Sequence, residues 1–293
     1  MKLKKLIAAL VAVVMMMSLT AVAAFAEDRE ESASPLDAIT GLFEQEDMNP
    51  MHVSPPTGDT LKLTNFALVA QYTGLGYNGG EQGPIIITKG TLKVDGQTCD
   101  IYLVTITGME LMSQDGQLVL NQATDPVTVG LAGMEQKNDL AWNVRKAMKQ
   151  YIPKDSNVVF AGHSLGGMVA QQVAATESIQ KRYNILHTVA FGSPAEFVLD
   201  REGTMIRLAD MGDIVPTMTL NGDLANNDPI YYEDGGYGDM DLTFDAHRNS
   251  YFREDEWGKY DALGDPNGDA VITLDLTTQQ FVKAPWAFTT LLG

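Results

Sequence analysis

Along residues 60 to 293, apolar and polar residues follow two patterns, one typical of buried strands and one typical of amphipathic helices. Val158 to Phe160 forms a short β-type run, and a small-residue helical segment follows from Gly167 to Ala175. A second helix is predicted over Asn138 to Tyr151, with its apolar residues on one face. Those residues are Leu140, Val144, Ala147, Met148 and Tyr151.

The same pattern predicts the other elements of the chain. A helix is expected at Leu63 to Gln71, and strands are expected near Gly90 to Val94, Thr98 to Thr107, Met205 to Leu208 and Val271 to Leu276, with another ending at Gly192. Strands that alternate with helices indicate an α/β class protein. We therefore expect a single domain with a mainly parallel central sheet flanked by helices.

The N-terminus predicts export. Lys2, Lys4 and Lys5 precede an apolar run from Leu6, and the stretch ends in Ala24-Phe25-Ala26, a small-residue cleavage site. Residues 1 to 26 are therefore interpreted as a secretory signal peptide, with a retained membrane anchor as the alternative. The expected product is a secreted, extracellular protein without stable transmembrane anchoring.

Residues 27 to 59 are rich in Glu, Asp, Ser and Pro and predict an acidic flexible leader, with a folded pro-segment as the alternative. The formal net charge is −18, and loss of residues 1 to 26 removes three lysines and no acidic residue, leaving −21. Such a charge disfavours nucleic acid and anionic membranes and suits neutral substrates. Cys99 is the only cysteine, so no intramolecular disulfide can form.

A strand, a sharp turn and a helix meet at Gly162-His163-Ser164-Leu165-Gly166, which fits the G-x-S-x-G pattern of a nucleophile elbow. The glycines are expected where a side chain would collide as the chain doubles back. The backbone N–H of Leu165 is the first candidate oxyanion donor, and His163 is interpreted as a packing or hydrogen-bonding neighbour. A chance match in a glycine-rich loop is the alternative.

A serine nucleophile needs a base and an acid further along the chain. His247 follows a polar Gly- and Asp-rich loop and is preferred over His187, which lies in an apolar stretch typical of a buried strand. Asp210 and Asp213 both follow the strand that ends at Leu208, and Asp213 is preferred because Ile-Val-Pro after it would anchor the loop.

Four landmarks in this order resemble the class 3 lipases, which are α/β-hydrolases: Gly-His-Ser-Leu-Gly-Gly at 162 to 167, Ala-Phe-Gly-Ser-Pro at 190 to 194, Gly-Asp-Ile-Val-Pro at 212 to 216, and Ala-His-x-x-x-Tyr around His247. The resemblance covers roughly residues 60 to 255. It implies Ser164 as nucleophile, Asp213 as acid and His247 as base.

The resemblance also implies a second oxyanion donor from the segment Ile106-Thr107-Gly108-Met109. Met109 replaces the family's usual hydroxyl residue, so only its backbone N–H can donate. Residues 109 to 136 lie where the family carries a lid, but Leu111 to Leu120 contains Asp115-Gly116 between apolar runs and predicts a hairpin turn. A covering loop is therefore a hypothesis.

No cofactor is expected for this chemistry. Asp265, Asn267 and Asp269 form a weak echo of a calcium loop, but Ala270 stands in place of its glycine, and an acidic turn before a strand is the preferred interpretation.

The implied function is hydrolysis of lipid carboxylic esters through an acyl-enzyme, as a triacylglycerol lipase or carboxylesterase. A phospholipase, thioesterase or acyltransferase on the same fold, or a non-catalytic secreted binding protein, are the alternatives, because a fold does not fix the substrate. The sequence specifies neither acyl chain length nor oligomeric state.

Overall fold

The computed structural model of the chain describes residues 53, 55–78, 81–109, 138–195, 201–217, 229–238 and 245–284. The predicted signal peptide, most of the acidic leader and the predicted hairpin at Leu111 to Leu120 lie outside these residues. Among the helices that are described, none has both the length and the apolar character required to cross a bilayer.

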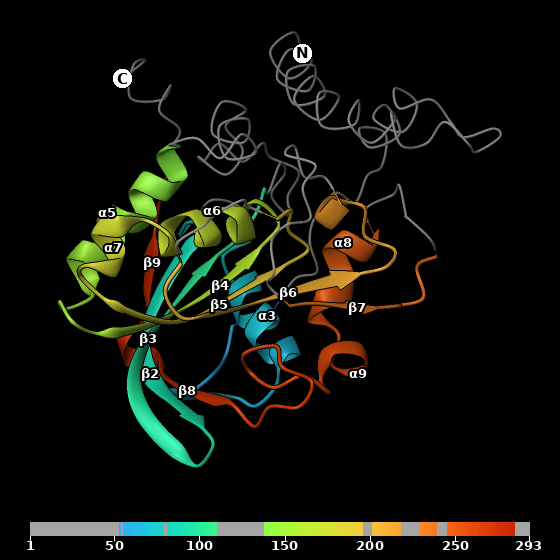
Figure 1. The fold of residues 1–293 in the computed structure, drawn as a ribbon, viewed down its shortest axis with the longest axis horizontal. Coiled ribbons are helices and arrows are strands. Elements are labelled where there is room, and N and C mark those ends of the chain that lie inside the picture. Colours follow the sequence, from blue (N-terminus) through green and yellow to red (C-terminus); the bar gives the residue numbers. More distant parts are fainter. Residues whose placement is uncertain are drawn as a thin grey trace, which may run out of the picture.

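The described elements alternate between strand and helix over much of the chain (Figure 1). In chain order they are β1 (Thr60–Leu63), α3 (Phe66–Gly74), β2 (Ile85–Val94), β3 (Gln97–Ile106), α5 (Asp139–Tyr151), β4 (Asn157–His163), α6 (Leu165–Ala174), α7 (Glu177–Gln180), β5 (Asn184–Phe191), β6 (Thr204–Asp210), η2 (Val215–Thr217), β7 (Ile230–Glu233), α8 (Asp245–Asn249), η3 (Ser250–Phe252), α9 (Glu254–Trp257), β8 (Val271–Asp275), η4 (Leu276–Thr278) and β9 (Gln280–Val282).

One mixed sheet contains all the described strands, in the order β1-β8-β2-β3-β4-β5-β6-β7, with β9 also paired to β2. Strands β3 to β7 run parallel, whereas the pairs β1–β8, β2–β8, β2–β3 and β2–β9 are antiparallel. The expectation of a mainly parallel sheet is therefore correct only for β3 to β7.

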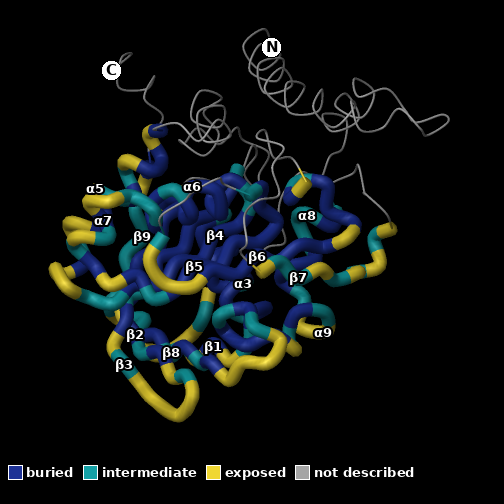
Figure 2. The backbone as a smooth tube through the Cα atoms, in the orientation of Figure 1, coloured by how far each residue is buried: buried dark blue, intermediate teal, exposed yellow. Residues whose placement is uncertain are grey.

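The antiparallel part depends on a tight turn between β2 and β3. Asp95 and Gly96 have φ of 50° and 74°, the left-handed conformation that a two-residue hairpin turn requires at both positions. The two strands then pair over ten residues each, from Ile85 opposite Ile106 to Val94 opposite Gln97. This hairpin projects from the sheet, and its tip is exposed (Figure 2).

Helices cover both faces of the sheet. One face packs against α3 and the segment that contains Tyr251, Phe252 and Trp257, and the other packs against α5 and α6. The central strands are consequently buried on both sides (Figure 2). Burial on both faces explains why these strands consist of apolar runs instead of alternating polar and apolar residues.

The first described helix, α3, begins at Phe66, three residues later than the predicted Leu63. The side chain of Asn65 accepts a hydrogen bond from the Leu68 N–H at 3.0 Å and caps the N-terminus of α3. Leu63 instead ends β1, where it pairs with Ile272 of β8. The strand partner comes from more than 200 positions away, so the local pattern of apolar residues did not distinguish strand from helix here.

Candidate active site

Ser164 lies in a strained turn between β4 and α6. Its backbone has φ of 56° and ψ of −128°, outside the regions that L residues ordinarily occupy, which costs about 1–3 kcal/mol. A Cβ added to Gly162 would lie 2.4 Å from the Gly166 carbonyl oxygen, and one added to Gly166 would lie 2.1 Å from the Ile106 oxygen. Both contacts are with backbone, so glycine is required at both positions.

The structure brings Ser164, His247 and Asp213 together, although they come from three separate segments. His247 Nε2 lies 3.0 Å from Ser164 Oγ, and His247 Nδ1 lies 2.8 Å from Asp213 Oδ2. The His247 side chain is 12% exposed and the Asp213 side chain is fully buried. The site thus runs from a half-buried hydroxyl to an enclosed carboxyl group.

The proton positions on Ser164, His247 and Asp213 follow from their hydrogen-bond partners. A carboxylate can only accept, so His247 donates from Nδ1 to Asp213. Its Nε2 then carries a lone pair that faces the Ser164 hydroxyl. This is the arrangement in which an imidazole can remove the serine proton during attack on a carbonyl carbon.

His247 lies in the short helix α8, in contrast to the loop position expected from the sequence. Ala246 is fully buried, and Tyr251 and Phe252 immediately beyond the helix pack into the core cluster under α3. These three apolar residues anchor a segment too short to show helical periodicity. His247 is therefore held on a packed element next to Ser164.

Asp213 has hydrogen-bond donors on both oxygens. Oδ1 accepts from the Val215 N–H at 2.9 Å, and Oδ2 accepts from the Tyr251 hydroxyl at 2.7 Å as well as from His247. Burial, followed by the nearby charge of Asp213, raises the pKa of Tyr251 well above its usual value, which keeps the phenol protonated as a donor. Tyr251 is the tyrosine of the Ala-His-x-x-x-Tyr landmark, but the sequence analysis gave it no role of its own.

Asp210, the other candidate acid, points elsewhere. Its Oδ1 accepts from the Gly212 N–H at 2.7 Å, and its Oδ2 accepts from the Gly235 N–H at 3.1 Å and from the Ser250 hydroxyl. It is 1% exposed. Asp210 therefore ties the turn after β6 to the segment after β7 and to η3.

The proposed oxyanion donors flank Ser164. Leu165 begins α6 directly after the serine and is buried. Segment 107–109 passes on the other side, because a Cβ added to Gly108 would lie 2.5 Å from Ser164 Cβ. Met109 is half-buried and packs against the core cluster that contains α5 and α6. Both backbone segments are therefore close to the hydroxyl.

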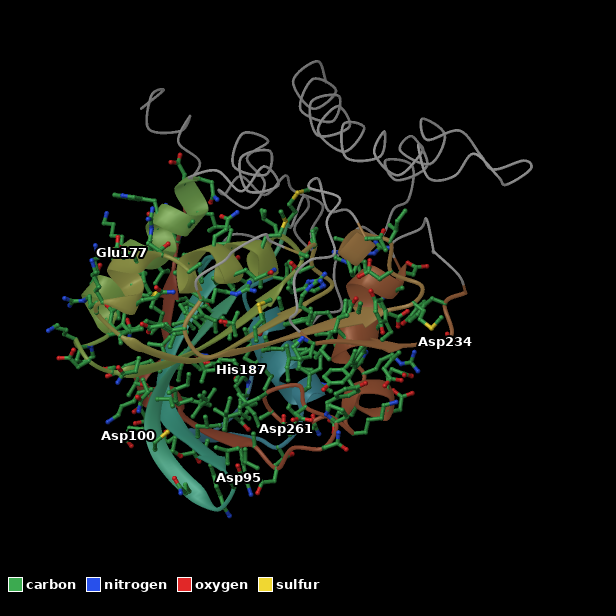
Figure 3. All side chains as sticks on the ribbon, viewed as in Figure 1. Asp95, Asp100, Glu177, His187, Asp234 and Asp261 are labelled. Atoms are coloured by element: carbon green, nitrogen blue, oxygen red, sulfur yellow. The ribbon has the colours of Figure 1, made fainter. Side chains whose placement is uncertain are left out.

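Within the part of the chain that the structure describes, the two other histidines, His163 and His187, are buried and hydrogen-bonded. His163 contacts the Tyr77 hydroxyl and the His247 carbonyl oxygen, at 2.6 Å and 3.0 Å. His187 lies in the interior, where its ring contacts the Thr204 hydroxyl and the Leu263 carbonyl at 2.6 Å and 2.8 Å (Figure 3). Burial lowers the pKa of His187 to about 4.

The residues of the weak calcium pattern do not converge on one point. Asp265 accepts from the Asn267 N–H at 2.8 Å, whereas Asp269 accepts from the Asp95 N–H at 2.8 Å. The turn is organised by Asp261 instead, whose carboxylate accepts the N–H groups of Leu263, Asp265 and Ala270. In the described part of the chain, no group of three or more His, Cys, Asp or Glu side chains is arranged to hold a metal.

The strand order, the elbow and the side chains gathered at the carboxyl ends of β4 and β6 define an α/β-hydrolase fold. Residues 120–222, which include Ser164 and Asp213, match the family model described as Lipase (class 3). The match ends before His247, so it does not cover the proposed base.

No curated protein matches this chain. Among solved structures, the Lip2 lipase from Yarrowia lipolytica is similar at a TM-score of 0.32 and 12% sequence identity, over 60% of this chain and 82% of that one. The fold assignment therefore rests on the strand order, the elbow and the family match.

Proposed function

We propose that the chain is a secreted serine hydrolase that cleaves carboxylic esters of lipids through Ser164, His247 and Asp213. The observation that carries the proposal is the continuous hydrogen-bonded line from Ser164 Oγ to His247 and on to Asp213, at 3.0 Å and 2.8 Å. The class 3 lipase match supports a lipid ester as the substrate class.

In the proposed reaction, His247 Nε2 takes the proton of Ser164 as the serine oxygen attacks the ester carbonyl. The backbone N–H groups of Leu165 and Met109 stabilise the tetrahedral oxyanion, and Asp213 stabilises the imidazolium that forms. His247 returns the proton to the leaving alcohol, and water then hydrolyses the acyl-enzyme by the same route.

Export is part of the proposal and rests on residues 1 to 26, with their lysines, apolar run and Ala-Phe-Ala site. The protein is expected outside the cell with Glu27 as its first residue. N-terminal sequencing of the protein recovered from the medium would check this. A chain retained with Met1 at its N-terminus would instead indicate an uncleaved anchor.

The central test is hydrolysis of p-nitrophenyl esters from acetate to palmitate, and of triolein, by residues 27 to 293. Ser164→Ala is expected to lower turnover by several orders of magnitude, because the nucleophile is lost while the fold is kept. Equal melting temperatures of the two proteins control for folding. Unchanged turnover in a pure, folded Ser164→Ala variant would contradict the proposal.

The same panel separates the candidate substrates. Serine-dependent cleavage of long-chain esters and triolein indicates a lipase, and preference for acetate and butyrate indicates a carboxylesterase. Phosphatidylcholine and acyl thioesters, added as further substrates, test the phospholipase and thioesterase alternatives. A fluorophosphonate probe that fails to label Ser164 would favour a non-catalytic binding protein.

A further inference from the structure

Tyr77 occupies the site without having been singled out by any sequence motif. It follows α3 in the loop that leads to β2, and Asn78 organises this loop. The Asn78 amide donates to the Leu75 carbonyl at 3.1 Å, and its oxygen accepts from the Gln82 N–H at 3.0 Å. These bonds hold the backbone next to Tyr77, and the Tyr77 side chain extends toward the site.

The Tyr77 hydroxyl lies beside the reacting serine. Its oxygen is 2.9 Å from the Gly108 nitrogen and 2.6 Å from His163 Nδ1. The position that a Cβ would occupy at Gly108 lies 3.0 Å from both the Tyr77 and the Ser164 hydroxyl oxygens. Tyr77 thus contacts the backbone of the predicted oxyanion segment on one side and a buried histidine on the other.

His163 continues the connection to the base. Its Nε2 lies 3.0 Å from the backbone carbonyl oxygen of His247. The rings of His163 and His247 are stacked, with centroids 4.7 Å apart, and Phe191 stacks with the His163 ring at 5.1 Å. At 1% exposure, His163 contacts the base without being accessible to a substrate.

The direction of each hydrogen bond follows from the groups available. A carbonyl oxygen only accepts, so His163 carries its proton on Nε2 and donates to His247. Burial, followed by the charge of His247, lowers the pKa of His163 well below its usual value and keeps the ring neutral. The lone pair at Nδ1 therefore accepts from the Tyr77 hydroxyl, whose oxygen in turn accepts from Gly108.

We propose that Tyr77 and His163 are positioning residues that fix the backbone of His247 relative to oxyanion segment 107–109 through one continuous hydrogen-bonded chain. This inference rests on the proposed function and adds a second connection to it. Asp213 holds the His247 ring, whereas the Tyr77–His163 chain holds its main chain and the donor segment opposite.

The hydrogen-bonded connection through Tyr77 and His163 matters because His247 lies in the short helix α8. A helix of five residues is marginal by itself, so the position of His247 depends on tertiary contacts. A displacement of about 1 Å of a catalytic group can cost on the order of 100-fold in rate. Neither Tyr77 nor His163 needs to bind substrate for this effect, so the loss should be in kcat and not in KM.

The kinetic test uses Tyr77→Phe, which keeps the ring and removes the hydroxyl. We expect kcat on a p-nitrophenyl ester to fall by about 10- to 100-fold, with KM within about twofold of wild type. His163→Phe keeps the stacking and removes both hydrogen bonds, so its kcat should fall at least as far. His163→Gln retains an N–H that can reach the His247 carbonyl and should recover part of the loss.

Tyr72→Phe is the matched control. The Tyr72 hydroxyl is also hydrogen-bonded inside the protein, to Thr88 at 2.6 Å and to Gln279 at 2.7 Å, and neither of these partners belongs to the site. It should lose a similar amount of stability with kcat unchanged. If Tyr77→Phe keeps wild-type kcat, or if Tyr72→Phe loses as much kcat, the positioning role is overturned.

A spectroscopic test does not depend on activity. In protein labelled with ¹⁵N-histidine, His163 is expected to be protonated at Nε2 only, and Tyr77→Phe should shift its Nδ1 resonance toward that of a free lone pair. If His163 is protonated at Nδ1, the proposed hydrogen bond from the Tyr77 hydroxyl to His163 is contradicted, whatever the kinetic results. If the wild type shows no serine-dependent hydrolysis, both the proposed function and the positioning role are overturned. The nitrogen chemical shifts would then still show whether the hydrogen bonds between Gly108, Tyr77, His163 and His247 exist.

Discussion

Two neighbouring aspartates after β6 have different surroundings. Asp213 accepts hydrogen bonds from His247, Tyr251 and Val215. Asp210 accepts hydrogen bonds from the Gly212 and Gly235 N–H groups and from the Ser250 hydroxyl. Sequence position favoured Asp213 over Asp210 but gave no view of these partners. The donors show that one carboxylate faces the imidazole and the other ties segments together.

This difference predicts opposite effects of the same substitution. Asp213→Asn should lower kcat by about 10³- to 10⁴-fold, because an amide cannot hold His247 in the required tautomer. Asp210→Asn should instead lower the free energy of unfolding by about 1–3 kcal/mol, because the new amide NH₂ group cannot accept the hydrogen bonds that the carboxylate oxygen accepts and leaves buried donors without an acceptor. Ester hydrolysis and urea unfolding of both variants check this.

The assignment would be reversed if Asp210→Asn lost kcat while Asp213→Asn lost only stability. Rates should be expressed per folded molecule, with the folded fraction of each variant taken from its urea unfolding curve. This correction matters because a destabilised variant can lose activity merely by unfolding.

At the scale of elements, the parallel strands β5 and β6 and the loop after α9 are joined through His187. Its Nδ1 contacts the Thr204 hydroxyl at the start of β6, and its Nε2 contacts the Leu263 carbonyl. The sequence correctly indicated a core histidine in a strand, because the surrounding residues are apolar. Its partners come from two other segments and had no local signal.

His187 makes stability depend on pH. Its pKa in the folded protein is about 4, below that of an exposed histidine at about 6.5, so the unfolded chain binds the proton first as the pH falls. The free energy of unfolding contributed by this group is complete above pH 6.5 and is lost toward pH 4, by about 3 kcal/mol in total.

Urea unfolding between pH 7 and pH 4 measures this effect. His187→Gln removes the titrating ring, and its free energy of unfolding should fall less steeply with acid than that of wild type. Carboxylates titrate in both proteins, so the difference between the two curves isolates His187. Parallel curves would show that the ring does not stay neutral in the fold.

At the scale of the whole molecule, the chain carries a formal net charge of −18. Excess charge of one sign destabilises a compact state through self-repulsion, and salt screens that repulsion. We expect the free energy of unfolding to rise as sodium chloride is raised from 10 to 200 mM. Potassium chloride should act equally, and a fall with either salt would contradict the prediction.

Several features could be predicted from the sequence because their causes are local. The elbow depends on adjacent residues: an apolar strand, glycines without Cβ atoms and a small-residue helix around Ser164. Helix α5 begins at Asp139, one residue after its predicted start, because Asn138 caps it through its own side chain, accepting from the Ala141 N–H at 2.8 Å.

Other features were decided only by tertiary structure, because they join residues distant in the chain. The antiparallel half of the sheet needs β8 and β9 to return beside β2, and local apolar patterns do not specify partners. The helical placement of His247, the donors on Asp213 and the chain from Gly108 through Tyr77 to His163 likewise depend on which segments meet. The sequence by itself determined the turn that holds Ser164, because the residues that form this turn are adjacent in the chain. Tertiary packing determined which side chains surround Ser164. Those side chains come from distant segments, and they can form hydrogen bonds with one another only after the sheet has assembled.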